Sequence, residues 1–132
     1  MLKRIDHVGV IVQDLEGMSR LLSEVLGMEL TRTLDVPERR LRARFFRCGD
    51  VDVELVELGD PEERARRLGD GPTRIEHIAI EVDDVAGTQS EMAEHGIRMT
   101  TPEPQRLGPT ASIFSQPDTS GGVMLQFLQR VG

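Results

Sequence analysis

Two histidines stand at matching positions of a repeated stretch of sequence. Residues 5–17 read IDHVGVIVQDLEG and residues 75–87 read IEHIAIEVDDVAG, so an offset of 70 residues relates His7 to His77. Neutral imidazole nitrogens are common ligands of divalent metal ions. A single histidine in a strand is more often part of the core, but packing does not explain why both copies keep one. The repeat therefore indicates a metal-binding role for the pair.

The last apolar stretches of the two copies also match. VDVELVEL (51–58) corresponds to GVMLQFLQ (122–129), and side chains alternate between the two faces of a strand. If the apolar residues face the helices, Glu54 and Gln126 lie on the opposite faces at equivalent places. Two imidazoles, one carboxylate and one carboxamide oxygen suit a divalent first-row metal with open positions. The residues expected to converge in a cleft are His7, Glu54, His77 and Gln126.

The elements that would position these side chains follow one βαβββ order in each copy. In the first copy, residues 5–12 have the composition of a strand, and Asp14 is a candidate N-cap. Apolar residues then recur at helical spacing until Gly27, a typical helix stop. The strands expected after this helix span residues 28–34, 41–48 and 51–58, and a short connecting helix follows Asp60.

The second copy repeats the plan with a weaker helix. A strand over residues 75–82 precedes Asp84 as N-cap, and the helix ends near Gly96. Further strands are expected over residues 97–101, 110–116 and 123–128, with a long loop over 102–109 and a turn over 117–122. The fold class expected is α+β, with two fused βαβββ modules whose curved mixed sheets enclose a metal-binding cleft.

The length of 132 residues fits one domain with a real core. We expect a single domain over residues 1–132, with module 1 at about 1–59, a connecting helix and linker at about 60–73, and module 2 at about 74–132. Cys48 is the only cysteine, which excludes an intrachain disulfide and a cysteine-based zinc cluster.

The charge and hydropathy of the chain exclude several classes of function. The net charge of −7 argues against a nucleic-acid partner, which would need a basic field. No apolar run approaches the ~20 residues of a membrane span, and the N-terminus lacks the apolar core of a signal peptide. We therefore expect a cytoplasmic protein with no nucleic-acid and no membrane partner.

The motifs quoted above resemble a known group of proteins. DHVGVIVQDL, LLSEVLGMEL and EHIAIEVDD are similar to the vicinal oxygen chelate (glyoxalase/bleomycin resistance/dioxygenase) superfamily, over essentially the whole chain. Within it, VDVELVELGDPEE, RIEHIAIEVDDVAG and QPDTSGGVMLQFLQ most closely resemble the methylmalonyl-CoA epimerases. The superfamily takes its metal ligands from the first and last strands of each module, which map onto His7, Glu54, His77 and Gln126. The family usually has glutamate at the last of these positions.

The resemblance implies a metal-dependent epimerase or isomerase that transfers a proton at the carbon α to a metal-chelated thioester carbonyl. The implied cofactor is a divalent ion of Co, Mn, Ni, Zn or Fe, and the substrate is a small molecule, with acyl-CoA compounds among the candidates. A homodimer is expected. Glu54 is the candidate catalytic base, since the neutral amide of Gln126 cannot take up a proton. One carboxylate against a dication leaves a net positive site, which favours an anionic substrate.

Three more side chains are candidates for substrate binding. Arg42 and Arg44 lie on an arginine-rich strand and share a face with Phe46, where one of them could bind a carboxylate or phosphate through two hydrogen bonds. Alternatively, these arginines protect a strand near the edge of a sheet. Glu81 shares a strand face with His77 and is either a site residue or a solvated acid.

Three other functions remain open from the sequence. His7, His77 and Glu54 could form the two-histidine, one-carboxylate site of a single-domain iron-dependent dioxygenase. The resemblance also admits a glyoxalase I-like lyase. A resistance protein that binds a small molecule without metal belongs to a different class, and the presence of polar residues at all four ligand positions argues against it.

Overall fold

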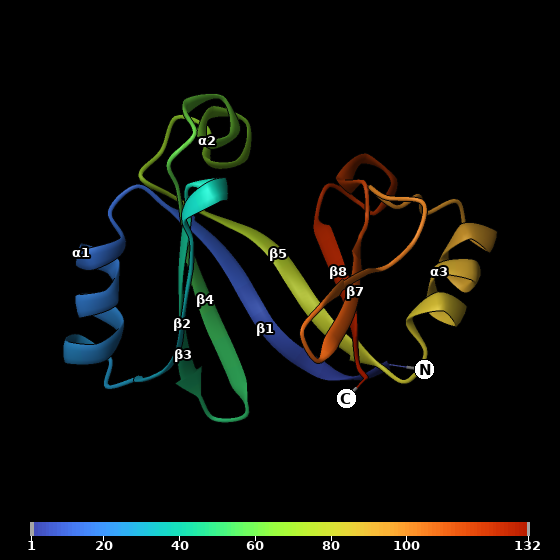
Figure 1. The fold of residues 1–132 in the computed structure, drawn as a ribbon, viewed down its shortest axis with the longest axis horizontal. Helices are drawn as coiled ribbons and strands as arrows, with labels where there is room; N and C mark the ends of the chain where they lie inside the picture. The colour runs from blue at the N-terminus through green and yellow to red at the C-terminus, as the bar shows by residue number, and fades with distance from the viewer. Residues whose placement is uncertain (1, 132) are drawn as a thin grey trace. The chain divides into compact units, whose positions relative to one another are not determined.

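The computed structural model describes residues 2–131, so Met1 and Gly132, the ends of the expected domain, lie outside the described residues. Within that range, eight strands form one mixed sheet in the order β2-β3-β4-β1-β5-β8-β7-β6 (Figure 1). The elements are, in chain order, β1 (Leu2–Val12), α1 (Leu15–Arg20), a π-helical turn (Leu21–Val25), β2 (Glu29–Val36), a 3₁₀ turn (Pro37–Arg39), β3 (Leu41–Cys48), β4 (Val51–Leu58), α2 (Pro61–Leu68), β5 (Thr73–Val82), α3 (Val85–Glu94), β6 (Gln105–Leu107), β7 (Thr110–Phe114), a 3₁₀ turn (Pro117–Thr119) and β8 (Met124–Arg130).

The residues group into two compact units. One comprises residues 7–76, and the other comprises residues 2–6 together with residues 77–131. The chain passes between the units at only two peptide bonds, Asp6–His7 and Glu76–His77, so β1 and β5 each contribute to both units. Across residues 2–131, no helix combines the length and the apolar composition that crossing a membrane requires.

In the unit of residues 7–76, β1 runs parallel to β4, and β3 pairs antiparallel with both β4 and β2. One face of these strands packs against α1, where the cross-strand partners Val10 and Leu55 meet Phe46 and Leu15. This is the helix-facing set that alternation predicts. The other face carries a second cluster, which reaches Leu68 of α2; its buried members are Ile11, Ala43, Phe45, Val56, Leu58 and Leu68.

In the unit of residues 2–6 and 77–131, β5 runs parallel to β8, β8 pairs antiparallel with β7, and β7 with β6. Val82, Ile113 and Phe127 pack with Val85 at the start of α3. The same connection of parallel first and last strands with a helix on one face therefore occurs in both units. Figure 1 shows α1 beside the strands of the first unit and α3 beside β7 and β8 of the second.

The two helices begin in the same way. Asp14 accepts a hydrogen bond from the backbone N–H of Gly17 (3.0 Å), and Asp84 accepts one from Gly87 (3.1 Å), which confirms both N-caps. The first amide of each helix donates to a side chain on the last strand of its βαβββ module, β4 or β8. Glu57 accepts from Leu15 (3.2 Å), and Gln129 accepts from Val85 (3.0 Å). The duplication thus extends to matched contacts between strand and helix.

The main departure from the expected elements lies before β7. Residues 97–101 do not form a strand, and only an isolated bridge joins Met99 to Ser115. Pro102 and Pro104 lack the N–H groups that would extend this pairing. The chain instead forms β6 inside the expected loop of residues 102–109, paired with β7 around Gly108, whose φ of +58° suits a tight turn. The expected helix of residues 15–26 also divides, with α1 ending at Arg20 and a π-helical turn following.

The packing of α1 on the sheet gives the first testable prediction. Leu55 is fully buried, so Leu55→Ala should lower the free energy of unfolding by about 2–5 kcal/mol. Leu30 on β2 is 49% exposed, and Leu30→Ala should cost less than about 1 kcal/mol. Urea denaturation followed by circular dichroism measures both values, since the chain has no Trp. Equal losses in the two variants would contradict this placement of the core.

Candidate functional site

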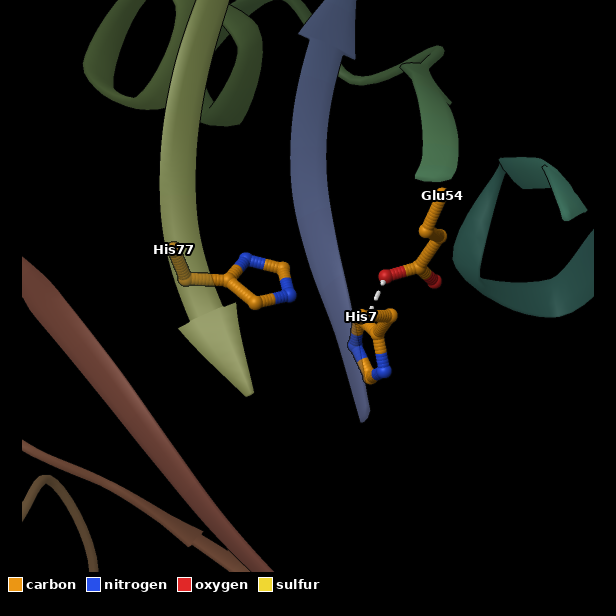
Figure 2. Close-up of side chains that lie close together, drawn as sticks. All are labelled: His7, Glu54 and His77. Carbon is orange, nitrogen blue, oxygen red and sulfur yellow. Dashed lines mark ion pairs between the residues drawn. The ribbon is translucent and has the colours of Figure 1, made fainter. Parts of the chain in front are cut away.

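His7 and Glu54 meet on the face of the first unit that lies opposite α1. The Nε2 atom of His7 is 3.4 Å from Oε1 of Glu54 (Figure 2), and the two side chains are 8% and 15% exposed. Both groups are thus largely withdrawn from water, where a carboxylate needs a partner of positive charge or hydrogen-bond donors. We name the cluster of His7, Glu54 and Phe45 the first half-site.

The strand register explains how these side chains meet. In the parallel β1–β4 ladder, Glu54 lies across from Gly9, two residues after His7 on the same face. Gly9 has no side chain, so His7 and Glu54 meet diagonally across the ladder. Phe45 pairs with Glu54 from β3, and its ring lies edge-to-face with the imidazole of His7, at 5.9 Å between centroids and 82° between planes. The aromatic contact restrains the orientation of the imidazole.

The second unit repeats the strand register and the aromatic contact, with Gln126 at the position that corresponds to Glu54. His77 is 3% exposed and lies edge-to-face with Phe114, at 5.7 Å and 86°. Gln126 on β8 pairs with Ala79 of β5 and with Phe114 of β7. A small residue two positions after the histidine, a phenylalanine on the adjacent strand and a polar residue on the last strand therefore recur. We name the cluster of His77, Phe114 and Gln126 the second half-site.

The first half-site fits a metal ion by distance and by donor type. Two ligand atoms at about 2.0–2.1 Å from one tetrahedral ion are about 3.4 Å apart. The separation between His7 Nε2 and Glu54 Oε1 has this value. An imidazole nitrogen and a carboxylate oxygen are ligands that zinc and the neighbouring first-row metals accept. The separation and the chemical type of the two atoms are therefore compatible with their binding one ion.

Glu81 lies within a cluster of basic side chains on its own unit. Its carboxylate is 3.4 Å from Arg4, 3.5 Å from Arg130 and 3.9 Å from Lys3, and its side chain is 12% exposed. Burial lowers the pKa of Arg4, but hydrogen bonds to Glu81 and Asp6 outweigh burial, so the pKa of Arg4 is raised overall. These contacts balance the charge of Glu81 within the cluster. Its role in substrate binding stays a prediction.

Arg42 and Arg44 lie on the α1 side of β3. Arg42 donates to Glu57 (3.2 Å) and Glu16 (2.9 Å), and Arg44 pairs with Asp35 (2.8 Å). Both share the face of Phe46, which packs in the core beneath α1. That face is opposite the one that carries Glu54, because Phe45 of the first half-site alternates with them along the strand. Substrate binding by these arginines stays a prediction, and their contacts link β3 to α1 and β2.

Sequence reasoning missed two residues of the half-sites. On β3, the sequence analysis named Arg42, Arg44 and Phe46 but did not identify Phe45, which contacts His7. The signal was present, because Phe45 and Phe114 are two of only four phenylalanines and stand 69 residues apart, close to the offset between the histidines. The register of the sheet decides which phenylalanine lies beside each histidine, and the sequence alone does not give this register.

The duplicated half-sites lie in a chain that matches a known family model, the Glyoxalase/Bleomycin resistance protein/Dioxygenase superfamily, over residues 4–127. The chain belongs to this superfamily. The resemblance inferred from the sequence is therefore confirmed, and so is the α+β class with two βαβββ modules. The structure of methylmalonyl-CoA epimerase from Mycobacterium tuberculosis has the same fold, with a TM-score of 0.88 at 21% identity over 99% of this chain and 90% of that one.

Several similar proteins within the superfamily are epimerases. The mitochondrial methylmalonyl-CoA epimerase of Bos taurus is 30% identical over 97% of this chain and 75% of its own length. The ethylmalonyl-CoA/methylmalonyl-CoA epimerase of Cereibacter sphaeroides is 26% identical over 98% of this chain and 99% of its own length. These similarities confirm the expectation that this superfamily member is an enzyme.

The contact between His7 and Phe45 gives the second prediction. Phe45→Leu removes the edge of the ring, so the imidazole of His7 should sample further rotamers in the metal-free protein. We expect exchange broadening of the His7 imidazole signals by NMR and a loss of about 1–2 kcal/mol in the free energy of unfolding.

Phe46 supplies the matched control for this experiment, because it occupies the opposite face of the same strand. Phe46→Leu should destabilise the core beneath α1 while the His7 imidazole signals stay sharp. If both variants broaden the His7 signals equally, Phe45 does not restrain the imidazole.

Proposed function

We propose that the chain is a metal-dependent epimerase or isomerase that transfers a proton at the carbon α to a thioester carbonyl. The observation that carries this proposal is the pair of half-sites, in a chain that is similar to methylmalonyl-CoA epimerases over 97% of its length. The substrate we infer from these relatives is methylmalonyl-CoA or a closely related acyl thioester. The proposal concerns both the metal site and the reaction, which separate experiments address.

The metal part of the proposal joins the two half-sites around one divalent ion. Its protein ligands would be His7, Glu54 and His77. The carboxamide oxygen of Gln126, at the position in β8 that corresponds to Glu54, would be the fourth. Support comes from the 3.4 Å separation of His7 Nε2 and Glu54 Oε1 and from the path of the chain. Figure 2 draws His77 beside these two residues. His7 is the first residue of the unit of residues 7–76, and His77 is the first residue after that unit.

The chemistry proposed for the site needs stabilisation of negative charge next to a proton transfer. A bound divalent ion would act as a Lewis acid toward the carbonyl oxygen of the substrate. Glu54 is the only ionisable carboxyl group among the four ligand positions, and it would take up the α-proton when its carboxylate is available. Gln126 is neutral and would orient ligands without exchanging a proton. The imidazoles, restrained by Phe45 and Phe114, would keep the site in one geometry.

The charge of the site favours a particular class of substrate. One carboxylate against a dication leaves a positive charge, and the largely buried setting strengthens its attraction for an anion. A malonyl-type thioester carries a free carboxylate beside the thioester carbonyl, so it presents two oxygens to the site. This substrate class therefore agrees with the ligand set as well as with the similar enzymes.

Several expectations from the sequence stay predictions. The module bounds at about 1–59, 60–73 and 74–132, a homodimer and a cytoplasmic location belong to this group. The connecting helix α2 belongs to the unit of residues 7–76, where it packs beside β4.

A second candidate function rests on the same ligand types. Two histidines and one carboxylate form the ligand set of non-haem iron oxygenases, in which the remaining positions stay open. If Gln126 does not ligate, the site has this composition. Consumption of oxygen by the Fe²⁺-loaded protein with a catechol would favour a dioxygenase over an epimerase.

The third prediction concerns metal content. Protein purified without chelators should carry one divalent metal ion per chain, and His7→Ala or His77→Ala should reduce metal content by at least about tenfold. Elemental analysis with circular dichroism as a check of folding measures this. His95→Ala is the matched control, because His95 lies at the C-terminal end of α3, outside both half-sites. Full metal retention in His7→Ala and His77→Ala would contradict the proposed ligands.

The fourth prediction concerns the reaction. In D₂O the metal-loaded protein should introduce deuterium at the α-carbon of methylmalonyl-CoA, measured by mass spectrometry. Glu54→Gln should slow this exchange by about 10²–10⁴-fold if Glu54 is the base. An N-acetylcysteamine thioester of methylmalonate provides a second substrate that tests the reaction without coenzyme A. Absence of exchange with both thioesters would exclude the epimerase function.

A further inference from the structure

An acidic residue directly precedes each of the two histidines. The dipeptides are Asp6–His7 and Glu76–His77, related by the same offset of 70 residues. Each acid is the last residue of a chain segment before the chain passes from one unit to the other. Each also binds an arginine of its own unit, Arg130 for Asp6 and Arg67 for Glu76. We call these two contacts the arginine clamps.

The clamp on Glu76 has two short, parallel hydrogen bonds. Nε of Arg67 lies 2.7 Å from Oε2 of Glu76, and Nη2 lies 2.8 Å from Oε1. The Glu76 side chain is only 4% exposed, so the guanidinium fixes a nearly buried carboxylate in two directions. The hydrogen bond to Glu76 raises the pKa of Arg67 above its ordinary value despite burial. Glu63 accepts a further hydrogen bond from Arg67 at 2.9 Å, within α2.

The clamp on Asp6 is more open. Nη2 of Arg130 lies 2.9 Å from Oδ1 of Asp6, and Nη1 of Arg4 lies 3.1 Å from the same atom. The Asp6 side chain is 14% exposed, whereas that of Arg130 is 51% exposed. Solvent weakens this contact relative to the clamp on Glu76. If the clamps act on the histidines, the effect should be larger for Arg67 than for Arg130.

Strand geometry connects each clamp to a histidine. Successive side chains of a strand point to opposite faces, so each acid and its histidine project on opposite sides of one peptide unit. A clamp that holds the acid therefore restricts rotation of the strand at the next residue. Arg67 lies on α2, which follows β4, and Arg130 is the last residue of β8. Arg67 thereby holds the strand of His77, and Arg130 holds the strand of His7.

We propose that Arg67 and Arg130 are positioning residues that orient His77 and His7 for binding one metal ion. The proposal rests on the metal site of the proposed function. Stability alone is a weak reason for the contact between Arg67 and Glu76, because well-packed apolar residues often replace a buried ion pair without loss. The repetition of an acid before each histidine, and of an arginine on each acid, links the clamps to the two half-sites.

Metal affinity of the folded protein provides the test. Zn²⁺ dissociation constants are measured by competition with a chromogenic chelator, and the Co²⁺ absorption spectrum reports the ligand geometry. Arg67→Lys keeps the positive charge but loses the paired hydrogen bonds, and we expect Zn²⁺ affinity to fall about 10-fold to 100-fold. Arg130→Lys should give a smaller loss in the same direction. The double variant Arg67→Met with Glu76→Leu removes both charges of the buried pair and leaves only the partly exposed Glu63 without its arginine. It should also bind Zn²⁺ more weakly.

The control variants separate positioning from general effects. Glu63→Gln removes the other partner of Arg67, and Arg66→Gln removes an exposed charge of the same helix. Both should keep the Zn²⁺ dissociation constant within about twofold of the unmodified protein and leave the Co²⁺ spectrum unchanged, because neither substitution removes the paired hydrogen bonds between Arg67 and Glu76.

Three outcomes would overturn the inference. If Arg67→Lys and the double variant keep the affinity and Co²⁺ spectrum of the unmodified protein, the clamps are only structural, while the proposed metal site stands. If the unmodified protein itself binds neither Zn²⁺ nor Co²⁺, the metal site is wrong and the positioning role is wrong with it. A loss of affinity equal in Arg66→Gln and Arg67→Lys would also reject the clamp.

Discussion

The alternation of side chains along a β-strand is the constraint on which the candidate site depends. β1 and β4 use one face to build the core beneath α1, with Val10 and Leu55, and the other face to bring His7 and Glu54 together. A shift of one residue in the β1–β4 register would exchange the two faces and bury the wrong set. The stability of the core and the geometry of the half-site are therefore fixed by one register.

The duplication shows which features belong to the scaffold and which to the chemistry. Asp14 and Asp84 cap their helices in the same way, and each histidine lies edge-to-face with a phenylalanine. The polar residue on the last strand differs, with Glu54 in one unit and Gln126 in the other. A metal site built from both half-sites would thus have a single carboxylate, so one group would carry both the negative charge and the capacity to accept a proton. The two modules therefore share one scaffold and differ in the polar residue on the last strand.

Local patterns in the sequence account for much of the fold. The bounds of β3 and β4 agree with those expected, because alternation in both strands, the valines of β4 and the turn at Gly49 are all encoded nearby. The strand expected over residues 97–101 is reduced to a bridge at Met99, and the short β6 was not expected, because strand pairing there depends on where β7 lies and on two prolines. For the same reason, the sequence indicated His7 and Glu54 as candidates but did not reveal Phe45 or the arginine clamps. Contacts between residues distant in the chain require the register of the sheet, which composition and spacing do not supply.

The central claim is that one ion binds both histidines. Pulsed electron paramagnetic resonance of protein loaded with one Cu²⁺ per chain tests it most directly, since the remote nitrogens of coordinated imidazoles give modulations whose combination lines count them. The account predicts two coordinated imidazoles in the unmodified protein and one in either His7→Ala or His77→Ala, with His95→Ala unchanged. A spectrum with a single imidazole that only one of these substitutions removes would contradict a metal site shared by the two half-sites.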